Sequence, residues 1–210
     1  MQLKINRIYI YIALQVVVAL LYYLGSLIVL FDTYTVPLTV VDYYIKPHFL
    51  AVWIYLSFFL LLFLTVYLSN KKNNILFVKL IIINSIISLI IFIFYPTFII
   101  DTDYYILQKN SPISFKVLSF IIEADVRSNC FPSLHVANSL LATIFLFRIK
   151  NKVITLTSTI WFCLIVWSVI STGQHYFYDV LGGVLLSIIS YNGLKYFELV
   201  KIQKRLKSKK

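Results

Sequence analysis

The segment Phe49–Ser69, FLAVWIYLSFFLLLFLTVYLS, carries no charged residue. It is long enough to cross the hydrocarbon core of a bilayer, which is about 30 Å thick. Similar apolar runs recur along the 210-residue chain, which is 60% hydrophobic and only 13% charged. A soluble domain of this length would need more charge to cover its surface. The sequence therefore predicts an all-α, polytopic membrane protein, a bundle of six transmembrane helices over residues 8–31, 49–69, 75–94, 131–147, 153–171 and 176–197.

The chain has no Pro-rich or Gly/Ser-rich stretch that would separate two domains. We therefore expect a single membrane domain over residues 1–200 and a basic cytoplasmic tail over residues 201–210. The first apolar run is too long for a signal-peptide apolar region, so we interpret it as a retained helix. The fourth predicted span is short and glycines interrupt the sixth, so these two spans depend partly on the motifs at their starts.

The longest connection runs between the third and fourth predicted spans, over residues 95–130. Loops of this length in compact chains are often functional. Its Tyr-rich beginning is typical of an interfacial aromatic belt. Apolar residues within it can share one helical face and predict a short helix that lies at the membrane interface: Ile113, Val117, Leu118, Phe120 and Ile121.

Basic residues follow alternate connections. The N-terminus, the second-to-third and fourth-to-fifth connections, the end of the last span and the tail together hold 15 of the 19 Lys and Arg. By the positive-inside rule, both termini are expected in the cytoplasm of a multi-pass cell-membrane protein. The net charge of +11 reflects this topology and a tail that can lie on anionic lipid. Since the basic residues form no single patch, we expect no nucleic-acid partner.

Two polar motifs stand where the fourth and sixth predicted spans begin: PSLH, residues 132–135, and QHYFYD, residues 174–179. In the predicted topology, both begin at the outer ends of their helices and face the same aqueous side. A helix N-terminus presents free N–H groups and the positive end of the helix dipole, which attract phosphate. Pro132 suits the first turn of such a helix, and Ser133 adds a hydroxyl donor there.

The motif residues together form a set suited to phosphoryl transfer. His175 and Asp179 are four residues apart, so they can share one helix face. The carboxylate can hold one imidazole nitrogen as N–H and leave the other free to attack phosphorus. His135 could protonate the leaving oxygen. Gly182 and Gly183, which follow, would let a neighbouring helix approach closely.

Each of these residues also has a purely structural interpretation. A lone His at a membrane interface is commonly an amphipathic surface residue, and this is our interpretation of His48. Asp179 could do no more than cap its helix. A metal or haem site made of His48, His135 and His175 lacks ligand spacing and a supporting carboxylate, so we expect no metal and no cofactor.

At these motifs the sequence resembles the type-2 phosphatidic acid phosphatase superfamily, the membrane lipid-phosphate phosphatases related to vanadium haloperoxidases. The resemblance implies a six-helix membrane bundle. The family's Pro-Ser-Gly-His motif is matched by PSLH, with Leu134 in place of Gly, and the form FPSLH is similar to a branch that includes inositol phosphorylceramide synthases. A further motif, Ser-Arg, five residues, His, three residues, Asp, is matched by Ser168, His175 and Asp179.

The resemblance also implies a role for each matched residue. His175 would attack phosphorus and form a phosphohistidine, with Asp179 as its orienting carboxylate. His135 would protonate the leaving group, and Ser133 and Ser168 would bind the substrate phosphate. Water, or a lipid hydroxyl in a transferase, would then resolve the intermediate.

The chain departs from the family pattern where positive charges are expected. The motif Lys, six residues, Arg-Pro is absent, and Asp101-Thr102 stands where relatives usually carry Arg-Pro. Val169 replaces the Arg of the Ser-Arg motif, and Gly173 stands where relatives often have Lys. Losing one donor to a transferring phosphoryl group typically costs about 3–4 kcal/mol of transition-state stabilisation.

Three cations of the outer loop could replace these charges. Arg127 is the best of them because it lies six residues before Ser133, and Lys109 and Lys116 are the others. Each could equally be a charge at the lipid surface.

The sequence thus predicts a membrane phosphatase or phosphotransferase that acts on lipid phosphates or phosphodiesters at the extracytoplasmic face. Its partner would be a membrane lipid. The alternative is a degenerate family member that binds lipid headgroups without turnover, because the expected positive charges are missing. The FPSLH form favours a synthase-like transferase, whereas the short chain favours simple hydrolysis. Headgroup, acceptor and oligomeric state stay open.

Overall fold

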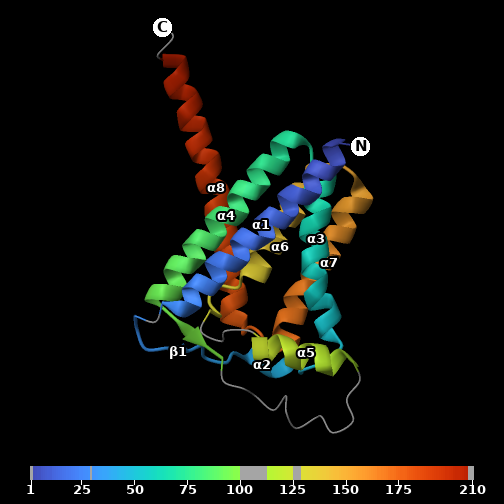
Figure 1. Cartoon of the computed structure of the whole chain (residues 1–210), viewed down its shortest axis with the longest axis vertical. Coiled ribbons are helices and arrows are strands. Elements are labelled where there is room, and N and C mark those ends of the chain that lie inside the picture. The colour runs from blue at the N-terminus through green and yellow to red at the C-terminus, as the bar shows by residue number, and fades with distance from the viewer. Residues whose placement is uncertain (1, 29, 100–112, 125–128, 208–210) are drawn as a thin grey trace.

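Helices make up nearly all of the secondary structure in the computed structural model, which describes residues 2–28, 30–99, 113–124 and 129–207. In chain order the elements are α1 (Gln2–Leu27), β1 (Tyr34–Thr35), α2 (Val40–Tyr44), α3 (Ala51–Leu68), α4 (Lys71–Phe94), β2 (Thr97–Phe98), α5 (Ile113–Ala124), α6 (Leu134–Phe147), α7 (Lys152–Ser171) and α8 (Phe177–Lys207). Figure 1 shows the long helices side by side as a bundle. This mostly helical architecture agrees with the predicted fold class.

Five helices are long and apolar enough to cross a membrane, over Asn6–Leu27, Ala51–Leu68, Lys71–Phe94, Lys152–Ser171 and Phe177–Lys201. They coincide with five of the predicted spans and support a membrane protein. The other predicted span corresponds to α6, which has only 14 residues. At 1.5 Å per residue this helix is about 21 Å long, shorter than a full span. A sixth crossing therefore stays a prediction.

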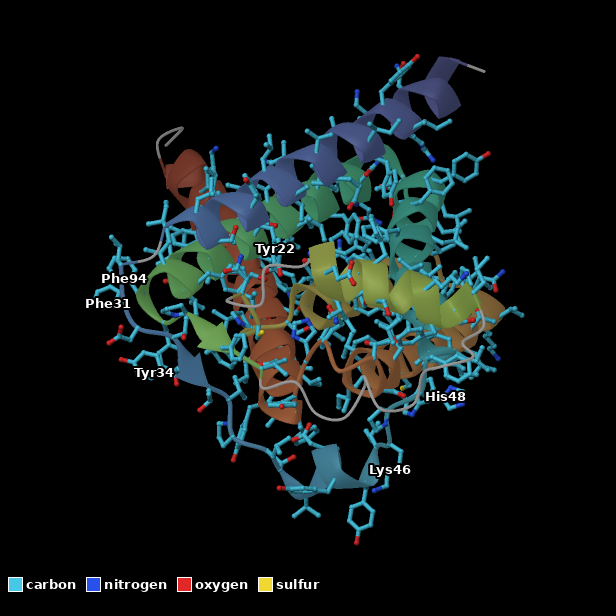
Figure 2. The ribbon with its side chains drawn as sticks, turned by 60° about the horizontal axis from the view of Figure 1, so that its bottom comes forward. Tyr22, Phe31, Tyr34, Lys46, His48 and Phe94 are labelled. Carbon is cyan, nitrogen blue, oxygen red and sulfur yellow. The ribbon has the colours of Figure 1, made fainter. Side chains whose placement is uncertain are left out.

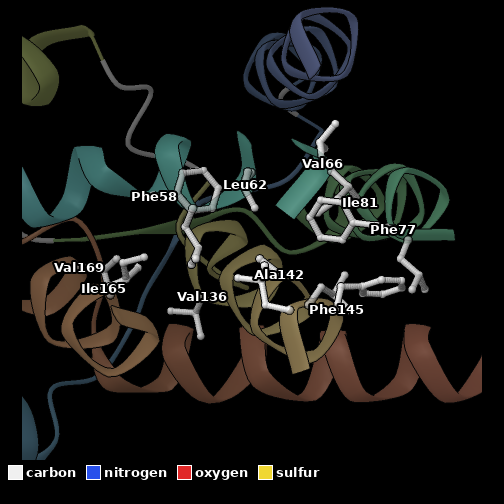
Figure 3. Packing of buried hydrophobic residues seen from close by; sticks show 14 of the residues in the cluster. Phe58, Leu62, Val66, Phe77, Ile81, Val136, Ala142, Phe145, Ile165 and Val169 are labelled. Atoms are coloured by element: carbon white, nitrogen blue, oxygen red, sulfur yellow. The ribbon is translucent and has the colours of Figure 1, made fainter. Parts of the chain in front are cut away.

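The short helix α6 forms the centre of the bundle. It packs against α3, α4, α7 and α8, and most of its residues are buried. Side chains of α3, α4 and α7 converge on it (Figure 3) and make one apolar core, which includes Phe58, Leu62, Phe77, Ile81, Val136, Ala142, Phe145, Ile165 and Val169. The outer faces of the longer helices carry exposed large apolar residues, as expected of surfaces that contact lipid.

One end of the bundle holds both ends of the described chain (Figure 1). Two arginines join helices there. The guanidinium of Arg7 donates to the carbonyl of Tyr67, which links α1 to α3. Arg148, which follows α6, donates to Asn73 Oδ1 at 3.1 Å and to the Tyr191 hydroxyl at 2.8 Å, which links α6 to α4 and α8. We refer to this end as the basic end.

The opposite end carries α2, α5 and a small parallel pair of strands (Figure 1). In this pair, Tyr34 lies opposite Thr97. Thr97 also bridges to Asn129, and its hydroxyl accepts a hydrogen bond from the Phe131 N–H at 2.7 Å. These contacts fix the path of the chain where it enters α6.

A helix, α5, forms within the loop where one was predicted, and it lies across this end of the bundle (Figure 1). It packs against α3, where the Trp53 indole donates to the Ser114 hydroxyl at 2.8 Å. Of the five residues predicted to share one apolar face, Leu118 is fully buried against the protein while Ile113 and Phe120 are each 70% exposed. Leu118 lies five residues from Ile113, about 140° around a helix with 3.6 residues per turn, so the two side chains can differ in burial. Its location at a membrane interface stays a prediction.

Candidate active site

The PSLH motif forms the start of α6. Ser133 is the N-cap, and its Oγ accepts a hydrogen bond from the Val136 N–H. Ser and Thr are favoured at this position because their oxygen satisfies a free N–H of the first turn. Pro132 therefore stands just before the cap instead of within the first turn, where the sequence placed it. The Ser133 N–H donates to the Asp179 carbonyl at 3.0 Å, which ties the start of α6 to α8.

The second motif forms the tight connection between α7 and α8. Gly173, which stands where relatives often have Lys, has a φ of 68°, a left-handed conformation that favours glycine. The backbone N–H of His175 donates to the Val169 carbonyl at 3.1 Å, so the ring is carried by a loop anchored on α7. His175 thus precedes α8, and the shared helix face expected for His175 and Asp179 is replaced by a turn into the helix.

Asp179 is fully buried and serves two neighbours. Its Oδ2 accepts a hydrogen bond from the Tyr176 N–H at 2.8 Å, so it does cap the start of α8. The same oxygen lies 3.6 Å from Nδ1 of His175. This separation exceeds a hydrogen bond, and His175 Nδ1 has no other partner. Catalytic hydrogen bonds are often this long before substrate binds.

The two motifs meet, although 40 residues separate their histidines. The ring centroids of His135 and His175 are 6.1 Å apart, with an angle of 57° between the ring planes. His175 is buried and His135 is half-buried. The His135 ring also packs on Tyr55, at 4.4 Å between centroids, and on Phe58, at 4.6 Å, so α3 fixes its position.

Both histidines line one cavity of about 300 Å³ between α1, α3, α4 and α6. Most of its walls are apolar, from Val18, Ala19, Tyr22, Tyr55, Phe58, Phe59, Phe92 and Leu134. Three amide side chains complete the described lining: Gln15, Asn129 and Asn138. None of the described lining residues is Lys or Arg. An apolar cavity with a few convergent polar groups is typical of a ligand site.

A comparison with protein families identifies the chain. The family model described as the PAP2 superfamily matches residues 38–192, about three quarters of the sequence, and spans both motifs. The chain belongs to the PAP2 superfamily. Members of this superfamily are generally phosphatases, so membership supports a hydrolase-type enzyme. No curated protein and no solved structure matches the chain.

The sequence motifs do not point to the three amides of this PAP2 cavity, because these side chains carry no charge and belong to neither motif. Gln15 lies in α1, outside the region matched by the PAP2 model. Asn138 accepts a hydrogen bond from Asn84 at 3.1 Å, and Asn129 donates to the Tyr22 carbonyl at 2.8 Å. The sequence signal that could have found Gln15 is a polar residue within an apolar span.

Two residues assigned to phosphate binding lie outside the cavity lining of the PAP2 chain. Ser133 is fully buried as the N-cap of α6. Ser168 is fully buried in α7, where its hydroxyl donates to the Ile165 carbonyl of its own helix at 2.8 Å. Val169, at the position of the missing Arg, is part of the apolar core.

The candidate replacement cations are only partly described. Arg127 and Lys109 lie outside the described residues, and Lys116 is exposed on α5. The third histidine, His48, lies just before α3 and its side chain is exposed. Figure 2 shows it near the edge of the molecule, apart from Tyr22 of the cavity lining. Its backbone N–H donates to the Ser171 carbonyl at 2.9 Å. Among the described residues, no group of three His, Cys, Asp or Glu side chains could hold a metal ion.

Proposed function

We propose that the protein is a membrane phosphatase or phosphotransferase that acts on lipid phosphates or phosphodiesters through a phosphohistidine intermediate. One observation carries the proposal: His135 and His175 meet at 6.1 Å in one cavity, with the buried Asp179 carboxylate behind His175. The apolar walls of that cavity suit the acyl or isoprenoid part of a lipid.

In the first step, Nε2 of His175 attacks the substrate phosphorus. The bond between phosphorus and the lipid oxygen breaks, and this oxygen takes a proton from His135. Asp179 holds the proton on Nδ1 of His175 and stabilises the positive charge that develops on the ring. The first N–H groups of α6, at Leu134 and His135, have no partner within the helix. Both residues line the cavity, and in this mechanism their N–H groups bind phosphate oxygens.

In the second step, water attacks the phosphohistidine. His135 takes the proton of this water, the bond between nitrogen and phosphorus breaks, and phosphate leaves with His175 restored. If a lipid hydroxyl replaces water, the product is a new phospholipid. The resemblance to inositol phosphorylceramide synthases at FPSLH motivates this transferase form of the proposal.

The site would face the extracytoplasmic side. The connection between α7 and α8, which carries His175, lies at the end of the bundle opposite the basic end (Figure 1), and the positive-inside rule assigns the basic end to the cytoplasm. We accordingly place both termini in the cytoplasm of a six-span protein of the cell membrane.

A second candidate function is lipid binding without turnover. It is favoured by the amide side chains in the described lining, which stand where charged donors would be more effective for catalysis.

The test is phosphate release from phosphatidic acid, isoprenyl phosphates and isoprenyl pyrophosphates by purified protein. We expect His175→Ala and His135→Ala each to lose activity. His48→Ala is the matched control, because this exposed histidine lies outside the cavity and its substitution should leave activity unchanged. Full activity in either cavity variant would refute the mechanism. Lipid that copurifies without any phosphate release would favour the binding function.

Hydrolysis and transfer are separated by adding an acceptor. With ceramide or diacylglycerol present, a transferase forms a new phospholipid visible by thin-layer chromatography, whereas a hydrolase releases only phosphate.

A further inference from the structure

Gln15 is an uncharged polar residue in the middle of an apolar helix. The segment Ile8–Leu24 contains no charged residue, and Asn6–Leu27 is long enough to cross a membrane. An amide buried in an apolar environment without a hydrogen bond is unfavourable, because it loses its hydrogen bonds to water and gains none in return. Such a residue within a span is therefore a functional candidate.

The amide nitrogen of Gln15 is buried and has no hydrogen-bond partner. It is not directed to lipid, because Gln15 lines the cavity that holds His135 and His175. The unpaired nitrogen is itself enclosed by protein atoms, so the side-chain amide has to rotate to present this donor to the cavity. A bound molecule with an acceptor oxygen would satisfy it.

One turn before Gln15, α1 contacts α3 close to His135. The Tyr11 hydroxyl donates to the Phe59 carbonyl at 2.8 Å, which sets α1 against α3. The Phe59 ring also lines the cavity, and its centroid is 6.5 Å from that of His135. Gln15 lies about 6 Å further along α1, toward the end of the bundle that holds the motifs.

We propose that Gln15 is a substrate-binding residue, whose amide donates a hydrogen bond to an oxygen of the lipid substrate. This inference rests on the proposed function and deepens it, because it makes α1 part of a site whose family match begins only at residue 38. The acceptor is either a phosphate oxygen or the carbonyl of an acyl chain attached close to the phosphate. The same donor chemistry serves both.

The experiment compares the wild-type protein with Gln15→Met, which keeps the length of the side chain and removes the donor. Ser26→Ala is the matched control on the same helix, because the Ser26 hydroxyl is exposed and donates only to the Tyr23 carbonyl of its own helix. Two substrates are used: phosphatidic acid, which has ester carbonyls, and an isoprenyl phosphate, which has none. Thermal unfolding in detergent checks that all three proteins are folded.

We expect Gln15→Met to lower kcat/KM about 10-fold, the effect of losing one hydrogen bond of about 1.4 kcal/mol. A loss on both lipids supports the proposal and assigns the acceptor as a phosphate oxygen. A loss on phosphatidic acid alone supports it and assigns the acceptor as an acyl carbonyl. Folded Gln15→Met protein with wild-type kcat/KM on both substrates would overturn the proposal.

Binding of radiolabelled phosphatidic acid to the same proteins in nanodiscs separates this inference from the proposed function. If the wild-type protein turns over no lipid, the phosphatase proposal fails while the role of Gln15 is still decided by binding. Weaker retention by Gln15→Met than by Ser26→Ala then supports the role. Equal retention, or no retention by the wild-type protein, overturns it.

Discussion

Substitution of Gly183 by Ala gives a direct test of how α8 is packed against the start of α6. A Cβ atom at this position would lie 2.5 Å from the Ser133 carbonyl oxygen, 3.1 Å from Val136 Cβ and 3.2 Å from the Ala137 nitrogen. The oxygen cannot turn aside, because it accepts the Ala137 N–H in the first turn of α6. The two helices must therefore separate locally.

Gly193 provides the matched control. It lies in the same helix, but a Cβ atom there would meet no atom within 4 Å. Both substitutions gain helix propensity, about 1 kcal/mol for Gly to Ala. Since this gain cancels in the comparison, the difference between the two variants reports the clash alone. Overpacking of this kind costs about 1–3 kcal/mol, and we expect the upper part of that range because backbone atoms are involved.

The assay has two readouts on protein purified in detergent. In thermal or denaturant unfolding, Gly183→Ala should be less stable than Gly193→Ala by about 2–3 kcal/mol. Because separation of α6 from α8 would shift His135 relative to His175, we expect phosphate release to fall about 100-fold, the loss that a 1 Å misplacement can cause. Two variants of equal stability and equal activity would refute the close approach of α8 to Ser133.

Three further substitutions test individual contacts. Asp179→Asn keeps a cap for α8 but removes the carboxylate beside His175, so phosphate release should fall by about 10²–10⁴-fold with the free energy of unfolding almost unchanged. Activity above a tenth of wild type would contradict this role. Arg148→Leu removes the guanidinium that joins α6 to α4 and α8, and it should lower the free energy of unfolding by about 1–3 kcal/mol. An unchanged unfolding curve would show that these hydrogen bonds do not stabilise the bundle. Asn84→Ala leaves Asn138 without its donor, and a double-mutant cycle with Asn138→Ala should give a coupling energy of about 0.6 kcal/mol; strict additivity of the two substitutions would count against the hydrogen bond.

Much of the fold follows from apolar run length. The apolar runs of the sequence are too long and too continuous to belong to a soluble core, so they predict membrane spans. Five of these predicted spans coincide with helices long and apolar enough to cross a membrane. The extent of α6 was harder to predict. Its run was read from residue 131, but the Ser133 side chain caps the helix and starts it at Leu134. An N-cap serine at that place is a local signal that sequence inspection can use.

The site could be predicted in part, for a physical reason. Ionisable residues at the starts of two predicted spans had to face the same side once the topology was fixed, and the structure brings His135 and His175 together. Gln15 could not be placed, because no local pattern says which face of α1 meets α3 and α4. The roles of Ser133 and Ser168 came from the motif alone, and motif spacing carries no information on which hydroxyls the packing buries.

The short length of α6 has a consequence for the surrounding lipid. Arg148 follows the helix and, as an arginine, has to stay near one membrane surface. The start of α6, with the imidazole of His135, would then lie about 9 Å beneath the other surface of a bilayer with a core of about 30 Å. Because longer helices enclose α6, headgroups and water must descend to that depth within the bundle to reach His135. We expect turnover in vesicles to depend on acyl-chain length, because a thinner bilayer shortens this descent.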